Sequence, residues 1–131
     1  MVKKRVLFLC VENSARSQMA EGFTRSLAGG CFDVYSAGSR PSGCVNPKAI
    51  KVMQEVGIDI SSQQSKGFEV LPATCFDYVI TLGCKDVCPY VPASRHIEWK
   101  IADPGGKGLA FFRKVRDDIR KKVKDFIKAT I

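Results

Sequence analysis

Short, continuously apolar segments alternate along this chain with longer segments whose apolar residues recur every three to four positions. The first apolar segment, KRVLFLC at residues 4–10, is rich in Val and Leu and shows no polar alternation. Such a segment is typical of a strand buried on both faces of a parallel sheet. Parallel strands need crossover connections, and the helix-like segments supply them. The pattern therefore predicts an α/β fold in which helices cover both faces of a parallel sheet.

The expected elements follow one another in a regular order. Strands are predicted at residues 4–10, 32–38, 76–83 and 95–99. Helices are predicted at residues 14–27, 47–56 and 107–128. Asn46 is a favourable N-cap, Pro47 suits the first helical turn, and Gly57 suits the position just past the helix end. With 131 residues, the chain is most economically one domain spanning residues 1–131.

The composition excludes several classes of protein. No apolar run approaches the roughly 18 residues of a membrane span, and the apolar stretch near the N-terminus is too short for a signal peptide. We therefore expect a cytoplasmic monomer with no membrane contact. In a reducing compartment, six cysteines favour catalytic or buried thiols over a disulfide framework. The single histidine, His96, and one closely spaced cysteine pair do not make a zinc site, so we expect no bound metal and no bound cofactor.

The net charge of +8 is concentrated near the C-terminus, in FFRKVRDDIRKKVKDFIK. The apolar residues of this segment recur at helical spacing, at Phe112, Val115, Ile119, Val123 and Phe126. This is the stripe of an amphipathic helix packed on a core, which makes the lysines and arginines its solvated face. We therefore expect no nucleic-acid partner; a dedicated polyanion site is the alternative.

The segment that follows the first predicted strand has the pattern C-x5-R-S. Its residues are Cys10, Val11, Glu12, Asn13, Ser14, Ala15, Arg16 and Ser17. A loop of this length between strand and helix can direct backbone N–H groups inward, as a nest for a tetrahedral oxyanion, and Asn13 tolerates the left-handed backbone it needs. The same donors, with a hydrogen bond from Ser17, favour the thiolate form of Cys10. Because the guanidinium of Arg16 can grip two oxygens of the anion, we predict a nucleophilic anion-binding loop.

This loop and several other segments resemble the low-molecular-weight tyrosine phosphatase superfamily, and more closely its arsenate reductase branch. The segments are VLFLCVENSARSQMAEGF, VYSAGS, VNPKAIKVMQEVGIDIS and ADPGG, which together extend over essentially the whole chain. The resemblance implies a four-stranded parallel sheet flanked by helices on both faces, with the Cys10 loop at its carboxyl edge. It also implies arsenate as the substrate, with phosphate and sulfate as competing oxyanions.

Asp103, in ADPGGKG before the last predicted helix, resembles the family's general acid. Chemistry at Cys10 expels an oxygen, and an oxygen leaves more easily when it is protonated. By itself, Asp-Pro-Gly is also a common turn before a helix. The phosphatases that resemble this chain usually carry aromatic residues after Asp-Pro, as a wall for the phosphotyrosine ring, whereas this chain has Gly105 and Gly106. The missing wall favours a small, bare oxyanion.

A second pair of thiols, Cys84 and Cys88, follows the third predicted strand. Reducing arsenate takes two electrons, so a second thiol must attack the Cys10 adduct and a third can accept the disulfide. Resemblance to the thioredoxin-coupled arsenate reductases implies that Cys84 attacks first, Cys88 second, and thioredoxin reduces the product; glutaredoxin with glutathione is the alternative reductant. Many relatives carry the first cysteine directly after the strand, where this chain has Gly83, so the order of attack stays open. Gly83 is expected to give the short loop the freedom to close a disulfide.

The residues leave two other functions open. One is a low-molecular-weight protein tyrosine phosphatase that forms a phosphocysteine at Cys10. The other is a redox sensor or anion-binding protein without enzymatic turnover. The remaining cysteines match no role in the family; they are Cys31, Cys44 and Cys75.

Some relatives bind potassium beside the loop. The residues that match theirs are Asn13, Glu21 and Ser36, together with an aspartate whose position is occupied here by Lys66. An ammonium group is therefore expected at the place of the cation, and we predict no potassium site.

Overall fold

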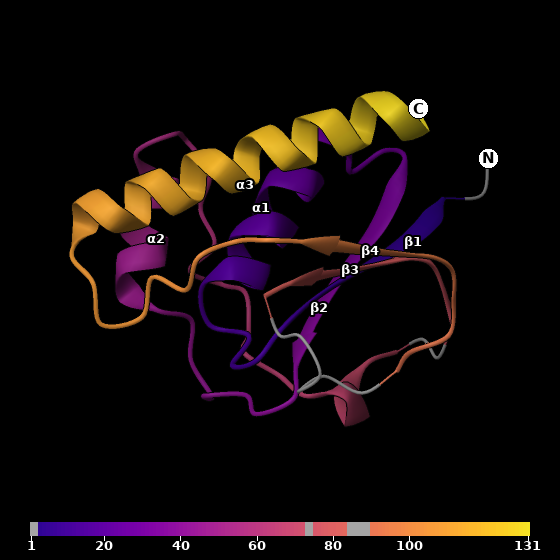
Figure 1. Cartoon of the computed structure of the whole chain (residues 1–131), viewed down its shortest axis with the longest axis horizontal. Coiled ribbons are helices and arrows are strands. Elements are labelled where there is room, and N and C mark those ends of the chain that lie inside the picture. Colours follow the sequence, from indigo (N-terminus) through magenta and orange to yellow (C-terminus); the bar gives the residue numbers. More distant parts are fainter. Residues whose placement is uncertain (1–2, 73–74, 84–89) are drawn as a thin grey trace.

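The computed structural model describes residues 3–72, 75–83 and 90–131 (Figure 1). The elements in chain order are β1 (Lys4–Cys10), α1 (Arg16–Ala28), β2 (Phe32–Gly38), α2 (Pro47–Gln54), the 3₁₀ helix η1 (Phe68–Val70), β3 (Phe76–Leu82), β4 (Ala93–Trp99) and α3 (Leu109–Thr130). The predicted alternation of strands and helices is confirmed. Two predicted site residues, Cys84 and Cys88, lie outside the described residues.

The four strands form one parallel sheet in the order β2-β1-β3-β4. The chain runs from β1 outward to β2 and then crosses back to β3 on the other side of β1. The strand order therefore reverses between β1 and β3, and such a switch point is where open α/β sheets bind ligands, beyond the carboxyl ends of the strands. Cys10, the last residue of β1, lies at this edge opposite Gly38 of β2.

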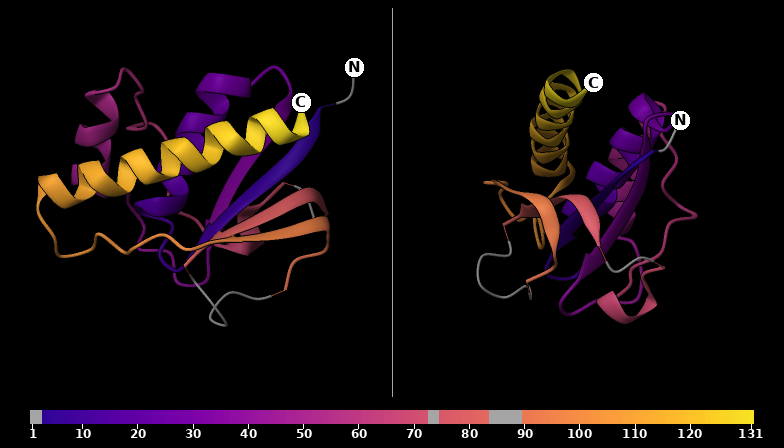
Figure 2. Two further views of the ribbon diagram at one scale, coloured as in Figure 1. Left: turned by 45° about the horizontal axis from the view of Figure 1, so that its top comes forward. Right: turned by 90° about the vertical axis from the view of Figure 1, so that its right-hand side faces the viewer.

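Side chains of β1 alternate between the two faces of the sheet. Val6 and Phe8 pack in one apolar cluster with α1, α2 and α3, whereas Leu7 and Leu9 pack in a second cluster. Figure 2 shows α1 and α3 together on one side of the sheet.

Both faces of the sheet are covered, but unevenly. Helices were predicted on both faces; in the described part of the chain the three α-helices share one face, and the other is covered by η1 and the segments around it. Residues 57–71 explain the difference, because GIDISSQQSKGFEVL has no apolar repeat long enough for an α-helix.

The ends of the helices test the local predictions. The Asn46 side chain accepts a hydrogen bond from the backbone N–H of Lys48 at 2.8 Å, which confirms the cap of α2. All five predicted apolar residues of α3 are buried, which confirms its amphipathic stripe. The start of α1 was predicted at Ser14, but the helix begins at Arg16 because the preceding residues form the anion-binding loop.

Within the described ranges, no helix combines the length and the apolar character that a membrane crossing needs.

Candidate active site

The loop at residues 11–15 is shaped by the segment that runs beside it. The carbonyl groups of Val11, Glu12 and Ser14 accept hydrogen bonds from the backbone N–H groups of Arg40, Ser42 and Asn46, at 2.8, 3.1 and 2.9 Å. In a trans peptide the N–H points away from the carbonyl. Anchoring the carbonyls on the outside therefore turns the N–H groups of the loop toward its interior, as an anion-binding nest requires.

Two backbone conformations make the loop possible. Asn13 has a φ of 50°, the left-handed conformation expected of it. Gly38, at the end of the neighbouring strand, lies so close that a Cβ there would be 2.5 Å from the carbonyl oxygen of Val11 and 2.8 Å from the backbone nitrogen of Asn13. A side chain at residue 38 would thus push the loop away from the sheet.

A buried polar network lies beneath the loop. The Cys10 Sγ lies 2.8 Å from the Ser17 Oγ, and Asn13 Nδ2 donates to the same oxygen at 2.7 Å. Asn13 Oδ1 accepts from the backbone N–H of Lys66 at 2.9 Å, which fixes the orientation of the amide. Since Asn13 donates to Ser17, the hydroxyl hydrogen of Ser17 remains for the sulfur. Ser17 is therefore placed to donate a hydrogen bond to the Cys10 sulfur.

Arg16 and Asp103 come together from distant parts of the chain. The guanidinium of Arg16 is nearly buried, and its Nη1 donates to the carbonyl oxygen of Ile101 at 3.2 Å. Its Nη2 lies 3.8 Å from Asp103 Oδ2. Asp103 Oδ1 accepts from the backbone N–H of Gly105 at 2.9 Å, while the side chain as a whole is 70% exposed. The structure thus brings the proposed acid beside the arginine of the loop, on the open side of the site.

Lys66 lies among oxygen atoms next to the loop. Its Nζ is 3.0 Å from the carbonyl oxygen of Gln64, 3.4 Å from Ser36 Oγ and 3.9 Å from Glu21 Oε1. Ser36 Oγ also donates a hydrogen bond to the Glu21 carboxylate. Burial lowers the pKa of Lys66, while the charge of Glu21 opposes that shift. The ammonium lies near Glu21 and Ser36, two of the residues that match potassium ligands in some relatives, and the absence of a potassium site stays a prediction.

Gln18 is a member of the site that our sequence analysis did not identify. It is fully buried, and its Nε2 donates to both the backbone and the side-chain oxygen of Asn13 at 2.9 Å. Gln63 Nε2 in turn donates to Gln18 Oε1 at 2.7 Å. The sequence offered one signal that Gln18 is buried, because it directly precedes the apolar residues Met19 and Ala20, which are buried in the structure. A buried amide needs several partners, and here they hold Asn13 in the loop.

Three cysteines in the described part of the chain lie outside this constellation. Cys31, Cys44 and Cys75 are exposed. Cys84 and Cys88 fall in the segment outside the described residues, so their roles stay predictions.

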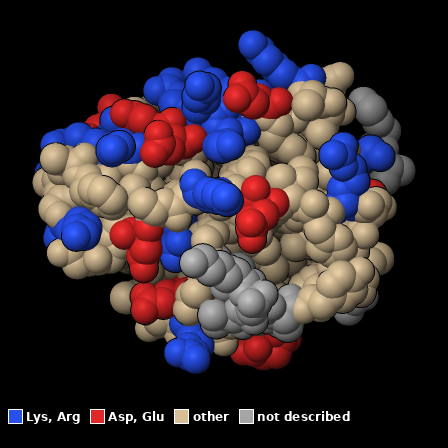
Figure 3. Space-filling view, in the orientation of Figure 1, with Lys and Arg blue, Asp and Glu red and all other residues tan. Residues whose placement is uncertain are grey.

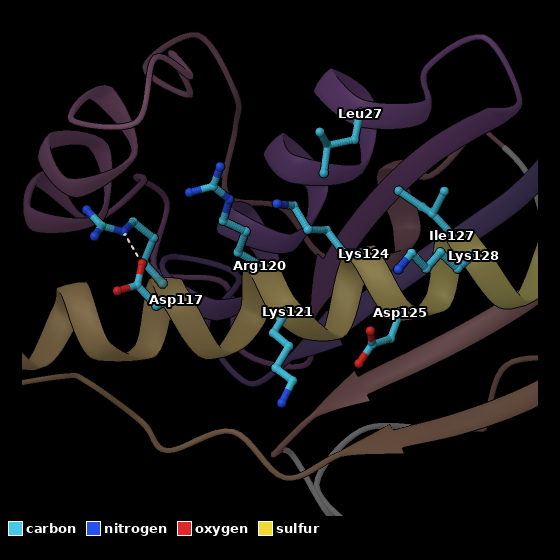
Figure 4. A pocket seen from close by; sticks show the side chains of 9 residues that line it. Leu27, Asp117, Arg120, Lys121, Lys124, Asp125, Ile127 and Lys128 are labelled. Atoms are coloured by element: carbon cyan, nitrogen blue, oxygen red, sulfur yellow. Dashed lines mark hydrogen bonds and ion pairs between the residues drawn. The ribbon is translucent and has the colours of Figure 1, made fainter.

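A separate groove runs between α1 and the second half of α3 (Figure 4). Its described lining includes Leu27 and several charged side chains of α3, but none of the loop residues. Arg120 and Lys124 point toward α1, while Lys121 and Asp125 point the opposite way. These charged side chains therefore point in different directions and do not converge on one binding site.

Acidic residues also offset much of the positive charge of α3. Glu55 forms ion pairs with Arg113 and Arg116, at 2.8 and 2.9 Å, and Arg116 also pairs with Asp117 at 2.9 Å. Hydrogen bonding from Arg113 is the main cause that lowers the pKa of Glu55 to about 2. Figure 3 shows acidic residues interspersed among the basic ones on this face. These contacts favour the solvated-face interpretation over a dedicated polyanion site.

Known proteins resemble the chain over nearly its whole length. Residues 5–131 match the family described as low molecular weight phosphotyrosine protein phosphatase. Arsenate reductase 2 of Staphylococcus saprophyticus is 45% identical over 130 residues, which cover 96% of this chain and 98% of that protein. The structure of an arsenate reductase in the phosphate-binding state is 40% identical, with a TM-score of 0.86. The match covers 98% of this chain and 99% of that protein. The structure of a thioredoxin-dependent arsenate reductase of Corynebacterium glutamicum is 32% identical, with a TM-score of 0.79. The match covers 97% of this chain and 61% of that protein.

Proposed function

Since the chain belongs to the low-molecular-weight phosphotyrosine protein phosphatase family, we propose that it is an arsenate reductase of that family. The observation that carries this proposal is full-length similarity to arsenate reductases, at 45% identity with the staphylococcal protein. The site supports it, because Cys10, Ser17 and Arg16 form a buried anion-binding arrangement. Gly105 and Gly106 replace the aromatic wall of a phosphotyrosine phosphatase and suit a small oxyanion.

The first step uses the anion-binding loop. The thiolate of Cys10 attacks arsenic, and an As–S bond forms while an As–O bond breaks. The inward N–H groups and the guanidinium of Arg16 stabilise the negative charge that develops on the other oxygens. Asp103 gives its proton to the departing oxygen, which leaves as water. Asp103 is suited to this step because it lies beside Arg16 and is exposed to solvent, from which it can be reprotonated.

The second step moves two electrons to arsenic. Cys84 attacks the sulfur of Cys10, the As–S electron pair passes to arsenic, and arsenite leaves. Cys88 then attacks Cys84, which regenerates the Cys10 thiol and leaves a Cys84–Cys88 disulfide. Thioredoxin is the proposed reductant of this disulfide, since one structural relative is thioredoxin-dependent; glutaredoxin with glutathione is the alternative. We place the reaction in the cytoplasm, in a monomer without nucleic-acid partners.

Replacing Asp103 by asparagine is expected to lower kcat for arsenate by about 10²- to 10³-fold, because the amide holds no proton to give to the leaving oxygen. Single-turnover arsenite release measures the effect directly. Asp117→Asn is the matched control, since Asp117 is also exposed but lies on α3 away from the loop. An Asp103→Asn variant with the wild-type rate would assign the general acid elsewhere.

Potassium is not expected to stabilise the protein, because the ammonium of Lys66 lies where the ion would be bound. Replacing Lys66 by aspartate should create an oxygen-rich site, so that Tm becomes higher in potassium chloride than in tetramethylammonium chloride by about 3 to 6 °C. Lys51→Asp makes the same charge change at an exposed position of α2 and serves as the control. A potassium-dependent Tm of the wild-type protein would contradict the prediction.

An arsenate turnover assay tests the proposed function. Purified protein is supplied in parallel with the thioredoxin system and with glutaredoxin plus glutathione, and arsenite is measured. We expect sustained turnover with thioredoxin. If both systems leave arsenate unchanged while an aryl phosphate is hydrolysed quickly, the phosphatase function is correct instead. A stable disulfide without either turnover would identify a redox sensor.

A further inference from the structure

Gly83 follows β3 directly and faces the arginine of the anion-binding loop. Its φ is 85°, in the left-handed region that side-chain-bearing residues rarely adopt. A Cβ at this position would lie under 3.0 Å from Nη1 of Arg16 and at 3.0 Å from the carbonyl oxygen of Ile101. Both atoms belong to the hydrogen bond that fixes the guanidinium, since Arg16 Nη1 donates to Ile101 at 3.2 Å. The missing side chain of Gly83 therefore leaves the space that this bond occupies.

The contact explains how Arg16 acquires a defined position. The arginine comes from the start of α1, whereas Gly83 and Ile101 follow β3 and β4. A long side chain with several rotatable bonds costs entropy to immobilise. Here its end is confined against two backbone segments at the carboxyl edge of the sheet and is nearly buried.

We propose that Gly83 is a positioning residue for the oxyanion-binding arginine, an inference that rests on the proposed function of Arg16 as a ligand of the substrate. Any side chain at residue 83 displaces Nη1, because the end of a flexible side chain yields more easily than the backbone of Ile101. The guanidinium then loses its bond to Ile101 and no longer meets the anion in a fixed orientation. This role is distinct from giving the Cys84–Cys88 loop freedom to close a disulfide.

The two roles of Gly83 affect different measurements. Loss of loop freedom slows the disulfide steps and leaves anion affinity unchanged. Displacement of Arg16 weakens the binding of any tetrahedral oxyanion, including one that is never reduced. Inorganic phosphate is therefore the informative probe, and its Kd is measured by isothermal titration calorimetry.

Gly83→Ala is compared with Gly57→Ala. Gly57, after α2, has nearly the same φ of 82°, but no described atom lies within 4 Å of the position that its Cβ would take. Both substitutions thus introduce a similar backbone strain, and thermal unfolding should show a further loss of stability only for Gly83→Ala, from its contacts with Arg16 and Ile101. We expect Gly83→Ala to weaken phosphate binding by about 10- to 100-fold and Gly57→Ala by less than about twofold.

A double-mutant cycle with Arg16→Ala isolates the contact. In the Arg16→Ala background the clashing nitrogen is absent, so Gly83→Ala should change the phosphate Kd by less than about twofold. Gly83→Asn repeats the test with a residue that tolerates the left-handed conformation better but still carries a Cβ, should the alanine variant not fold.

The outcomes separate this inference from the proposed function. If Gly83→Ala and Gly83→Asn bind phosphate as tightly as Gly57→Ala, or if the effect of Gly83→Ala persists undiminished without Arg16, the positioning role is wrong. Neither outcome bears on arsenate turnover by the wild-type protein. Conversely, a wild-type protein that reduces no arsenate but loses phosphate affinity on Gly83→Ala would retain the positioning role and lose the reductase assignment.

Discussion

Replacing Cys10 by serine is expected to abolish both arsenate reduction and aryl phosphate hydrolysis, with kcat falling by about 10⁴-fold or more. A serine hydroxyl at this position is a far weaker nucleophile than a thiolate. In the proposed mechanism the hydrogen bond from Ser17 and the loop N–H groups stabilise an anion on sulfur, but they do not generate one on a neutral alcohol.

Phosphate binding separates loss of the nucleophile from loss of the site. Because Arg16 and the loop N–H groups remain, Cys10→Ser should still bind inorganic phosphate within about threefold of the wild-type Kd. Cys31→Ser serves as the control, since this thiol is exposed and lies just before β2. Residual multiple turnover of arsenate by Cys10→Ser would assign the nucleophile to another thiol.

Replacing Cys84 or Cys88 by serine is expected to lower multiple turnover of arsenate by about 10³-fold or more, while aryl phosphate hydrolysis stays within a few-fold of wild type. The reason is electron supply, because one thiol cannot deliver two electrons and return to its starting state. Hydrolysis of a phosphate ester transfers no electrons and therefore needs neither residue.

Single-turnover measurements distinguish the two thiols. If Cys84 attacks first, Cys88→Ser should release about one arsenite per enzyme and then stop as a Cys10–Cys84 disulfide, whereas Cys84→Ser should release almost none. The opposite pattern would reverse the order of attack. Cys75→Ser, which removes an exposed thiol just before β3, is the matched control. Undiminished multiple turnover in both Cys84→Ser and Cys88→Ser would refute the thiol cascade.

The sequence was sufficient where a feature depends on neighbours in the chain. The uninterrupted apolar run of β1 and the apolar stripe of α3 predicted buried elements, and both are confirmed. The cap at Asn46 is also local and is confirmed. The start of α1 was predicted two residues early, because the carbonyl of Ser14 is held by Asn46, a residue far along the chain. Helix propensity depends on nearby residues in the chain and therefore does not account for so distant a partner.

The chemistry proposed for the candidate site stays a prediction, and it comes from the order of residues, which places a thiol, a guanidinium and a hydroxyl in and beside one short loop. Tertiary structure decided what surrounds them. The carbonyl of Ile101, the bare Cα of Gly83 and the backbone N–H of Lys66 reach the loop residues from segments that follow other strands. The crossovers of a parallel sheet gather such segments at one edge, where each contact depends on the packing of the whole sheet and on no local pattern.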